Sequence, residues 1–424
     1  MRTWHSMGVA IVIGAVALAG SGLRVVVAQN SSGQRGEALQ RDTRRVGEPG
    51  DSPSANADRL PKDVYPDSRN RLPLVKREDL DERGKKSYDA AFATTKSIAG
   101  LQGEAGIRLQ GGSEDIRFES PIGRRLTELA IITGAREAEQ NFEWTLHVEE
   151  ALRQGLEMSI IDVVRYGKPV TGLGEKEAAI IEVGREMAEK HNVTSETFAQ
   201  ALRTLGKSNL VDVVVTLAQR ANETPLIWVD QHLPLDWKEV APMPLTIIPS
   251  PPDIFPDSRS RLREMEGQRQ GIPGRTLSPK GMGPAQIELH SGGGKFLEAN
   301  LGRRLMELAI LVTARELDQQ VEWTLHEAEA RKQGLEPAII DIVRYRKPAT
   351  GLGEKEMVII QAGRELIGKH HVSSETYAHA VKLFGERDAL DLVTLIGQHA
   401  ATAGILTAFN QQLPAGQKPL LPIP

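Results

Sequence analysis

Two stretches of this chain are nearly the same. Residues 123–147 read GRRLTELAIITGAREAEQNFEWTLH, and residues 302–326 read GRRLMELAILVTARELDQQVEWTLH. The two copies align without a gap from these glycines to Gly206 and Gly385, and about 60% of the aligned residues are identical. Self-similarity at a fixed distance defines domain boundaries, so the sequence predicts two tandem copies of one unit.

The duplication also extends upstream of these stretches. The motif Tyr65-Pro66-Asp67-Ser68-Arg69 recurs as Phe255-Pro256-Asp257-Ser258-Arg259, so each copy spans roughly 170 residues. Five prolines between Val240 and Pro252 are typical of a semi-rigid linker. We therefore expect the first domain at 61–237, a linker at 238–252 and the second domain at 253–424.

The apolar residues of each copy recur with the spacing of buried helical faces. In the first copy they are Leu126, Leu129, Ala130 and Thr133; Trp144, Leu146 and Ala151; Ile160, Ile161, Val163 and Val164; and Leu210, Val211, Val213, Val214 and Leu217. Residues 175–190 form a long amphipathic pattern, and Thr194 or Ser195 can cap the helix that follows. The third helix must stop before Lys168-Pro169. No segment alternates with a period of two, so we predict an all-α fold, with each copy a bundle of about six helices.

The N-terminus has the layout of a secretory signal peptide. Arg2 gives a positive start, an apolar stretch runs from Met7 to Ala19, and small residues lead to Ala28. The apolar stretch is short for a membrane span, which needs about 20 residues. We expect a signal peptide at 1–28 and export to the periplasm or beyond, with an uncleaved anchor as the alternative. Residues 29–60 are poor in apolar residues and are expected to form a flexible tether.

The composition is that of an ordinary soluble globular protein. Hydrophobic residues make up 40% of the chain and charged residues 25%, with a formal net charge of -4. Acidic residues are interspersed with Lys and Arg throughout, which argues against a nucleic-acid partner. The chain has no cysteine, which excludes disulfides, lipid attachment at a cysteine and all thiol chemistry.

Polar residues that could take part in catalysis or metal binding lie in the quoted stretches. Glu143 and His147 are four residues apart, so on a helix they project from one face and can reach the same object. Glu128 lies on the preceding helical stretch, beside residues that pack inward. The second copy repeats these three residues as Glu307, Glu322 and His326.

These residues resemble the motif of the carboxymuconolactone decarboxylase family, which includes the alkylhydroperoxidase D-like proteins. The similarity lies in Arg125-Leu126-Thr127-Glu128-Leu129, in the aromatic-Glu-Trp-x-x-His segment from Phe142 to His147, and in Gly155-Leu156. It covers both copies and so most of the mature chain. The resemblance implies two tandem alkylhydroperoxidase D-like helical bundle domains and a small-molecule substrate.

One branch of that family does redox work with a Cys-x-x-Cys pair, supported by a Glu and a His. By the spacing from Glu128 and His147, those thiols would fall on Gln140 and Glu143, and in the second copy on Gln319 and Glu322. A peroxidase of that type needs a thiolate nucleophile and a resolving thiol. Because this chain has neither, the sequence predicts that it has no thiol peroxidase activity.

Resemblance to the other branch implies a lyase that removes CO2 from a carboxylated unsaturated lactone without a cofactor. Loss of CO2 leaves electron density that must be delocalised and then protonated, so the site needs a cation or donor and a general acid. An imidazole can give a proton near neutrality. The candidate catalytic residues are His147, Glu128, Glu143, His326, Glu307 and Glu322. The candidate substrate-binding residues are Arg136, Arg315, Trp144 and Trp323, with Arg124 and Arg125 as further carboxylate anchors.

Each of these assignments has an alternative. A Glu-His pair at helical spacing is often an ordinary surface or interior pair, and Trp144 and Trp323 also suit packing in the core. Glu128, Glu143 and His147 can form a metal site, but no second histidine at ligand spacing accompanies them, so we expect no metal. The alternative function is an exported, non-enzymatic binding or scaffold protein on the same fold.

The family commonly assembles as rings of single units, so the resemblance implies a homo-oligomer here. A chain with two fused copies would act as a pseudo-dimer, and three chains would supply six copies. Light scattering on the mature protein should therefore give the mass of a trimer. A clean monomer would contradict this prediction.

Overall fold

The computed structural model describes residues 60–73, 75–80, 114–229 and 300–423, with isolated positions at 82, 84–86, 88, 89, 253, 255, 261 and 298. Helices make up the regular structure of these residues, and no β-strand occurs among them, which confirms the all-α prediction. The predicted signal peptide, the linker at 238–252 and all but the last residue of the tether lie outside the described residues.

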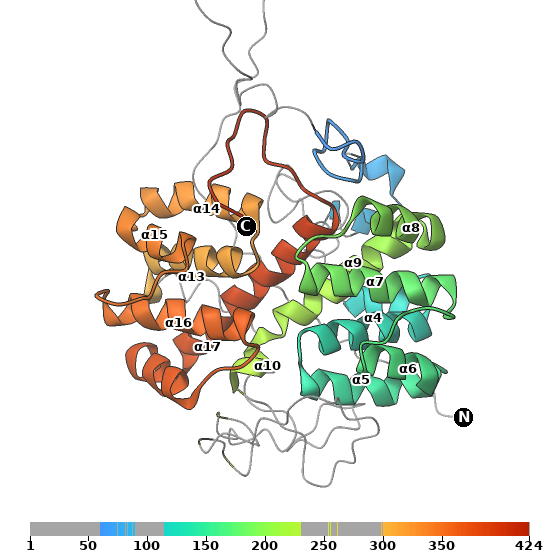
Figure 1. Cartoon of the computed structure of the whole chain (residues 1–424), viewed down its shortest axis with the longest axis horizontal. Helices are drawn as coiled ribbons and strands as arrows, with labels where there is room; N and C mark the ends of the chain where they lie inside the picture. The colour runs from blue at the N-terminus through green and yellow to red at the C-terminus, as the bar shows by residue number, and fades with distance from the viewer. Residues whose placement is uncertain are drawn as a thin grey trace, which may run out of the picture.

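The helices follow the same order in both copies (Figure 1). The first copy contains the short 3-10 helix η1 (Arg77–Asp79) and α3 (Glu114–Glu119), α4 (Arg124–Glu137), α5 (Asn141–Arg153), α6 (Met158–Arg165), α7 (Glu175–Glu189), α8 (Ser195–Leu205), α9 (Lys207–Asn222) and α10 (Thr224–Val229). The second contains α13 (Arg303–Glu316), α14 (Gln320–Lys332), α15 (Pro337–Arg344), α16 (Glu354–Gly368) and α17 (Ser374–Ala408).

The central helices are α4 and α13. Every residue from Leu126 to Ala135 is buried, and so is every residue from Leu305 to Arg315. A helix that is buried all round lies in the middle of its bundle. Accordingly α4 packs against α5, α7 and α9, and α13 packs against α14, α16 and α17.

Local signals in the sequence set several helix ends. The Thr194 hydroxyl accepts a hydrogen bond from the Thr197 backbone N–H (3.2 Å) and so caps α8, as expected. Ser373 caps the start of α17 in the same way. Helix α6 ends at Arg165, just before the Lys168-Pro169 pair that disfavours helical geometry.

Helix α17 is two helices joined at Gly385. This glycine has φ 80° and ψ 162°, and its counterpart Gly206, with φ 75° and ψ 161°, separates α8 from α9. Such a positive φ favours glycine, which has no Cβ to clash. By length and composition α17 could cross a membrane, but most of its apolar stretch is buried inside the protein, as in a core helix.

The two copies are joined along α9 and α17, which cross at the centre of the molecule (Figure 1). The hydrophobic core around α4 includes Ala401, Ile405 and Phe409 from the end of α17. The core around α13 includes Trp228 from α10. Each core therefore takes side chains from both copies, so neither copy completes its own interior.

Two buried arginines at equivalent positions of the repeat, Arg71 and Arg261, link the two copies by hydrogen bonds. Arg71 donates to the carbonyl oxygen of Val193 in its own copy (2.8 Å) and to that of the last residue of α17 (3.2 Å). Arg261 does the same in reverse, donating to the carbonyl oxygens of Val372 (2.8 Å) and Trp228 (3.0 Å). Ala408 and Trp228 lie at the C-terminal ends of α17 and α10, where carbonyl oxygens lack intrahelical partners, so the bonds across the junction satisfy them.

Close packing of α13 against α16 depends on Gly363. A Cβ atom there would lie 2.5 Å from Cγ1 of Val312, whose branched side chain has little freedom to move. We expect Gly363→Ala to lower the free energy of unfolding by about 1–3 kcal/mol, measured by urea denaturation. The control is Gly368→Ala at the exposed end of the same helix, where the nearest atom lies 3.7 Å away. An equal effect of both substitutions would contradict the packing argument.

Candidate functional site

Glu128 is the centre of the site in the first copy. It lies on α4 with 0% of its surface exposed, and its Oε2 atom lies 2.7 Å from Nδ1 of His147 on α5. His147 Nε2 lies 3.2 Å from Oε2 of Glu143, one turn earlier on α5. The structure thus brings together the three residues that the sequence pattern singled out, with the imidazole between two carboxylates.

Two arginines compensate the buried charge of Glu128. Its Oε1 atom accepts hydrogen bonds from Arg117 on α3 (3.0 Å) and Arg124 on α4 (2.8 Å). Burial is the largest single influence and would raise the pKa of Glu128. The charge and hydrogen bond of His147 and the two guanidinium groups outweigh it and lower the pKa to about 2. Glu128 is therefore a carboxylate throughout the physiological pH range.

A third arginine joins a second pair of carboxyl groups to this network. Arg220 on α9 donates to Oε2 of Glu143 (3.0 Å) and contacts Oε1 of Glu223 (2.6 Å). Burial raises the pKa of Glu223 well above its ordinary value despite Arg220, and the charge of Glu143 adds to this effect. The network therefore links a charged Glu143 to a Glu223 carboxyl group that holds its proton more tightly than an ordinary glutamate does.

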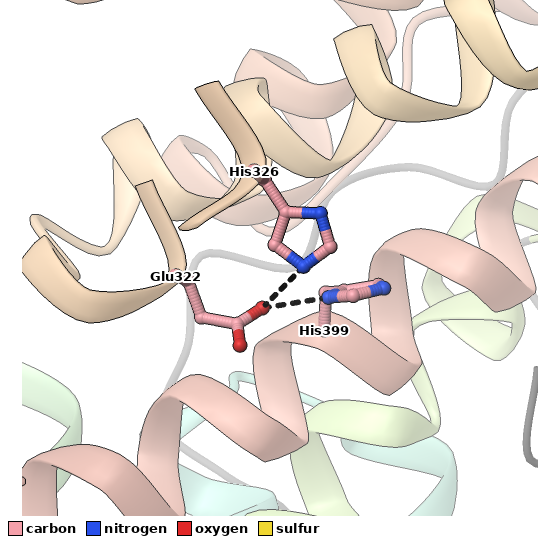
Figure 2. Close-up of side chains that lie close together, drawn as sticks. All are labelled: Glu322, His326 and His399. Carbon is pink, nitrogen blue, oxygen red and sulfur yellow. Dashed lines mark hydrogen bonds and ion pairs between the residues drawn. The ribbon is translucent and has the colours of Figure 1, made fainter. Parts of the chain in front are cut away.

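The second copy repeats the core of this arrangement but changes its surroundings. His326 Nδ1 on α14 lies 2.8 Å from Oε2 of Glu307 on α13. Its Nε2 atom lies 3.9 Å from Oε2 of Glu322, which receives a closer contact of 2.7 Å from Nδ1 of His399 on α17. Figure 2 shows Glu322 and His326 on α14 converging with His399 on α17. His399 occupies the position that Arg220 holds in the first copy.

The predicted substrate-binding arginines lie elsewhere. Arg136 donates from Nε to the backbone carbonyl of Arg165 (3.0 Å), and Arg315 donates to that of Pro422 (2.8 Å). Neither has a described contact with a Glu-His pair. Arg125, the further candidate, pairs with Glu157 and Glu177 instead. Of the arginines considered from the sequence, Arg124 is the one that the structure places at the site.

The two predicted tryptophans are enclosed in the hydrophobic cores. Trp144 and Trp323 both have 0% of their surface exposed. The indole N–H of Trp323 donates to Glu327 Oε2 at 2.8 Å. Neither ring therefore offers an exposed face on which a substrate can stack.

The glutamines at the positions of the family's first thiol have a structural role. The side-chain oxygen of Gln140 accepts from the backbone N–H of Phe142, and that of Gln319 accepts from Val321, each at 2.9 Å. Both glutamines thus cap the helices that carry the histidines.

Sequence reasoning missed four members of the site: Arg117, Arg220, Glu223 and His399. For Arg220 and His399 a signal existed, because the same offset that aligns the two glutamates also aligns these two residues. Each lies 77 residues after its partner glutamate. Periodicity within one helix could not show which glutamate a residue on another helix would reach.

A cavity of about 140 Å³ lies beside the first site, between the two copies. Its walls are largely apolar and come from both sides of the junction, including Met187, Leu217, Ala403 and Thr407. Arg220 also lines it, so this guanidinium connects the cavity with Glu143. Glu128 and His147 do not line the cavity.

Comparison with models of protein families, with curated proteins and with solved structures gives no match to this chain. The resemblance to the decarboxylase family therefore rests on the motif residues themselves.

The lowered pKa of Glu128 makes the protein sensitive to acid. A carboxylate whose folded pKa lies below its ordinary value of 4.5 stabilises the fold above that pH. This contribution is lost as the pH falls from 4.5 toward about 2. At pH 7 we expect Glu128→Gln to lower the free energy of unfolding by about 3–5 kcal/mol, because it leaves the partly buried Arg117 and Arg124 without their buried partner. The difference between variant and wild type should narrow between pH 4.5 and pH 2.

Urea denaturation at several pH values measures this difference, with Glu175→Gln at an exposed position of α7 as the control. A deficit of Glu128→Gln that is the same at pH 7 and in acid would show that the carboxylate charge does not stabilise the fold.

Proposed function

We propose that this chain is a carboxymuconolactone decarboxylase-like lyase that acts on a small carboxylated lactone or unsaturated acid by proton transfer. The observation that carries the proposal is the hydrogen bond between a buried glutamate and a histidine, present in both copies at 2.7 and 2.8 Å. A carboxylate at one ring nitrogen fixes the orientation of an imidazole, and an oriented imidazole is a suitable general acid.

In the first copy the pair belongs to a longer chain of proton-binding groups. Glu128 holds Nδ1 of His147, and Nε2 of His147 faces Glu143. Arg220 bridges Glu143 to Glu223, whose raised pKa favours the neutral acid. These contacts support a route by which His147 could be reprotonated after it gives up a proton.

The cavity between the copies suits a small carboxylated molecule. Its volume of about 140 Å³ is close to the roughly 150 Å³ of an apolar cavity that holds benzene. The wall also contains Glu137, His191 and His370, and Arg220 supplies its permanent cation. A guanidinium binds a carboxylate with two parallel hydrogen bonds. We propose that Arg220 anchors the substrate.

The reaction needs no redox partner. The bond from the substrate to its departing carboxylate breaks, and the electron pair moves into the conjugated carbonyl group of the substrate. CO2 leaves, and a proton from His147 forms the new C–H bond. Because His147 does not line the cavity, the proposal requires the substrate held by Arg220 to extend past Glu143 to the imidazole. Arg220 stabilises the negative charge that develops, and solvent protons restore His147 through the carboxyl groups beside it.

The test is turnover of a panel of carboxylated lactones and unsaturated acids, measured as release of CO2. His147→Ala should lower kcat by about 10²- to 10⁴-fold for a substrate that the wild type converts. His379→Ala, on α17 outside both sites, is the matched control and should leave kcat unchanged. Unchanged turnover in a His147→Ala, His326→Ala double variant would overturn the proposal.

One observation favours a second candidate, a non-enzymatic binding or scaffold protein. Glu128 has no exposed surface, and its oxygens are already engaged, Oε1 by Arg117 and Arg124 and Oε2 by His147. On this alternative the charges hold α3, α4 and α5 together, and the cavity binds a ligand unchanged. Calorimetry would then detect binding of a carboxylated ligand that Arg220→Met weakens, with no CO2 release from any member of the panel.

A further inference from the structure

Three potential metal-binding side chains meet in the second copy. Glu322, His326 and His399 each offer one ligand atom, and these three atoms lie within 4.8 Å of one another. The residues come from α14 and α17 (Figure 2). Glu322 is buried, and only 17% and 20% of the two imidazole side chains are exposed. The set is therefore held by packed helices and is largely removed from solvent.

The spacing fits a first-row transition metal. Ligand bonds of about 2.0–2.1 Å in a tetrahedral arrangement place ligand atoms about 3.3 Å apart. Oε2 of Glu322 lies 2.7 Å from His399 Nδ1 and 3.9 Å from His326 Nε2, so the present distances bracket that value. Small side-chain rotations would bring all three atoms to bonding distance of one ion.

Glu307 prepares His326 for this role. Its Oε2 atom lies 2.8 Å from Nδ1 of His326, so in the neutral ring Nδ1 carries the hydrogen. The lone pair is then on Nε2, the nitrogen that points toward Glu322 and His399. A carboxylate behind a metal-bound imidazole is the usual arrangement in metal sites, because it fixes the orientation of the ring and increases its basicity.

The first copy is a natural contrast at the same position. Arg220 contacts Glu143 there as His399 contacts Glu322 here. A guanidinium is permanently charged and has no lone pair to offer a metal, whereas a neutral imidazole is a common metal ligand. The change from Arg220 to His399 at this position thus replaces a permanently charged guanidinium by an imidazole that can bind a metal ion.

We infer that Glu322, His326 and His399 form a binding site for a divalent transition-metal ion such as Zn²⁺. Two imidazoles and one carboxylate are a ligand set that zinc and iron proteins use, and they leave coordination positions for water or a substrate oxygen. In this copy the ion takes the Nε2 atom that a proton donor would need. Proton transfer of the proposed lyase then belongs to His147, and the second copy has a separate role.

Metal binding can be measured without any substrate. The full mature chain is freed of metal with a chelator and titrated with Zn²⁺ by calorimetry and with Co²⁺ by visible absorption. We expect about one equivalent to bind, with an absorption band typical of Co²⁺ bound by few ligands. Zn²⁺ should also raise the melting temperature, since a ligand that binds only the folded chain stabilises it.

The matched variant is His399→Arg, which installs the residue of the first copy and should preserve the fold. It should abolish the Co²⁺ band and the thermal shift. Glu307→Gln, which removes the carboxylate behind His326, should weaken binding by about 10- to 100-fold. His379→Ala, on the same helix, should bind as the wild type does. Failure of the wild type to bind either ion, or equal binding by His399→Arg, would overturn the inference while leaving the lyase proposal intact.

Discussion

A glutamate buried at the centre of each bundle is the constraint around which the rest of the site is built. Glu128 and Glu307 lie on the two central helices, with 0% and 6% of their surfaces exposed. An ionised carboxylate in such surroundings is tolerated only when cations or hydrogen-bond donors compensate it. In both copies the first compensating group is a histidine one helix away.

The two copies complete this compensation differently. In the first, Arg117, Arg124 and Arg220 surround the glutamates and the histidine with permanent charges. In the second, His399 replaces Arg220, so the corresponding carboxylate faces an imidazole instead of a permanently charged guanidinium. The same backbone therefore surrounds the Glu-His pair with fixed charges in the first copy and with the proposed metal ligand His399 in the second. The duplicated sites are thus not equivalent.

Packing of α9 against α17 makes this divergence possible. These helices join the copies, and they also supply Arg220 and His399 to the glutamates on α5 and α14. The exchange of Trp228 and Phe409 between the cores, together with Arg71 and Arg261, fixes the helices in place. The cavity lies at the same junction and is lined by residues of both copies, so its shape depends on how α9 packs against α17.

The sequence by itself determined the helical class, the duplication and the placement of Glu143 and Glu322 one turn before His147 and His326, because these depend on periodicity and on spacing within one helix. It offered Glu128 and Glu307 as partners of the histidines, and the structure supplied those contacts. It also determined the absence of thiol chemistry, which depends on residue type alone. It placed Arg136 and Arg315 at the substrate and found no second histidine for a metal. Only the tertiary structure turned those arginines toward backbone carbonyls and brought His399 beside Glu322 from 77 residues away. The physical reason is that the crossing of two packed helices, which no periodicity records, decides which distant side chains share a buried site.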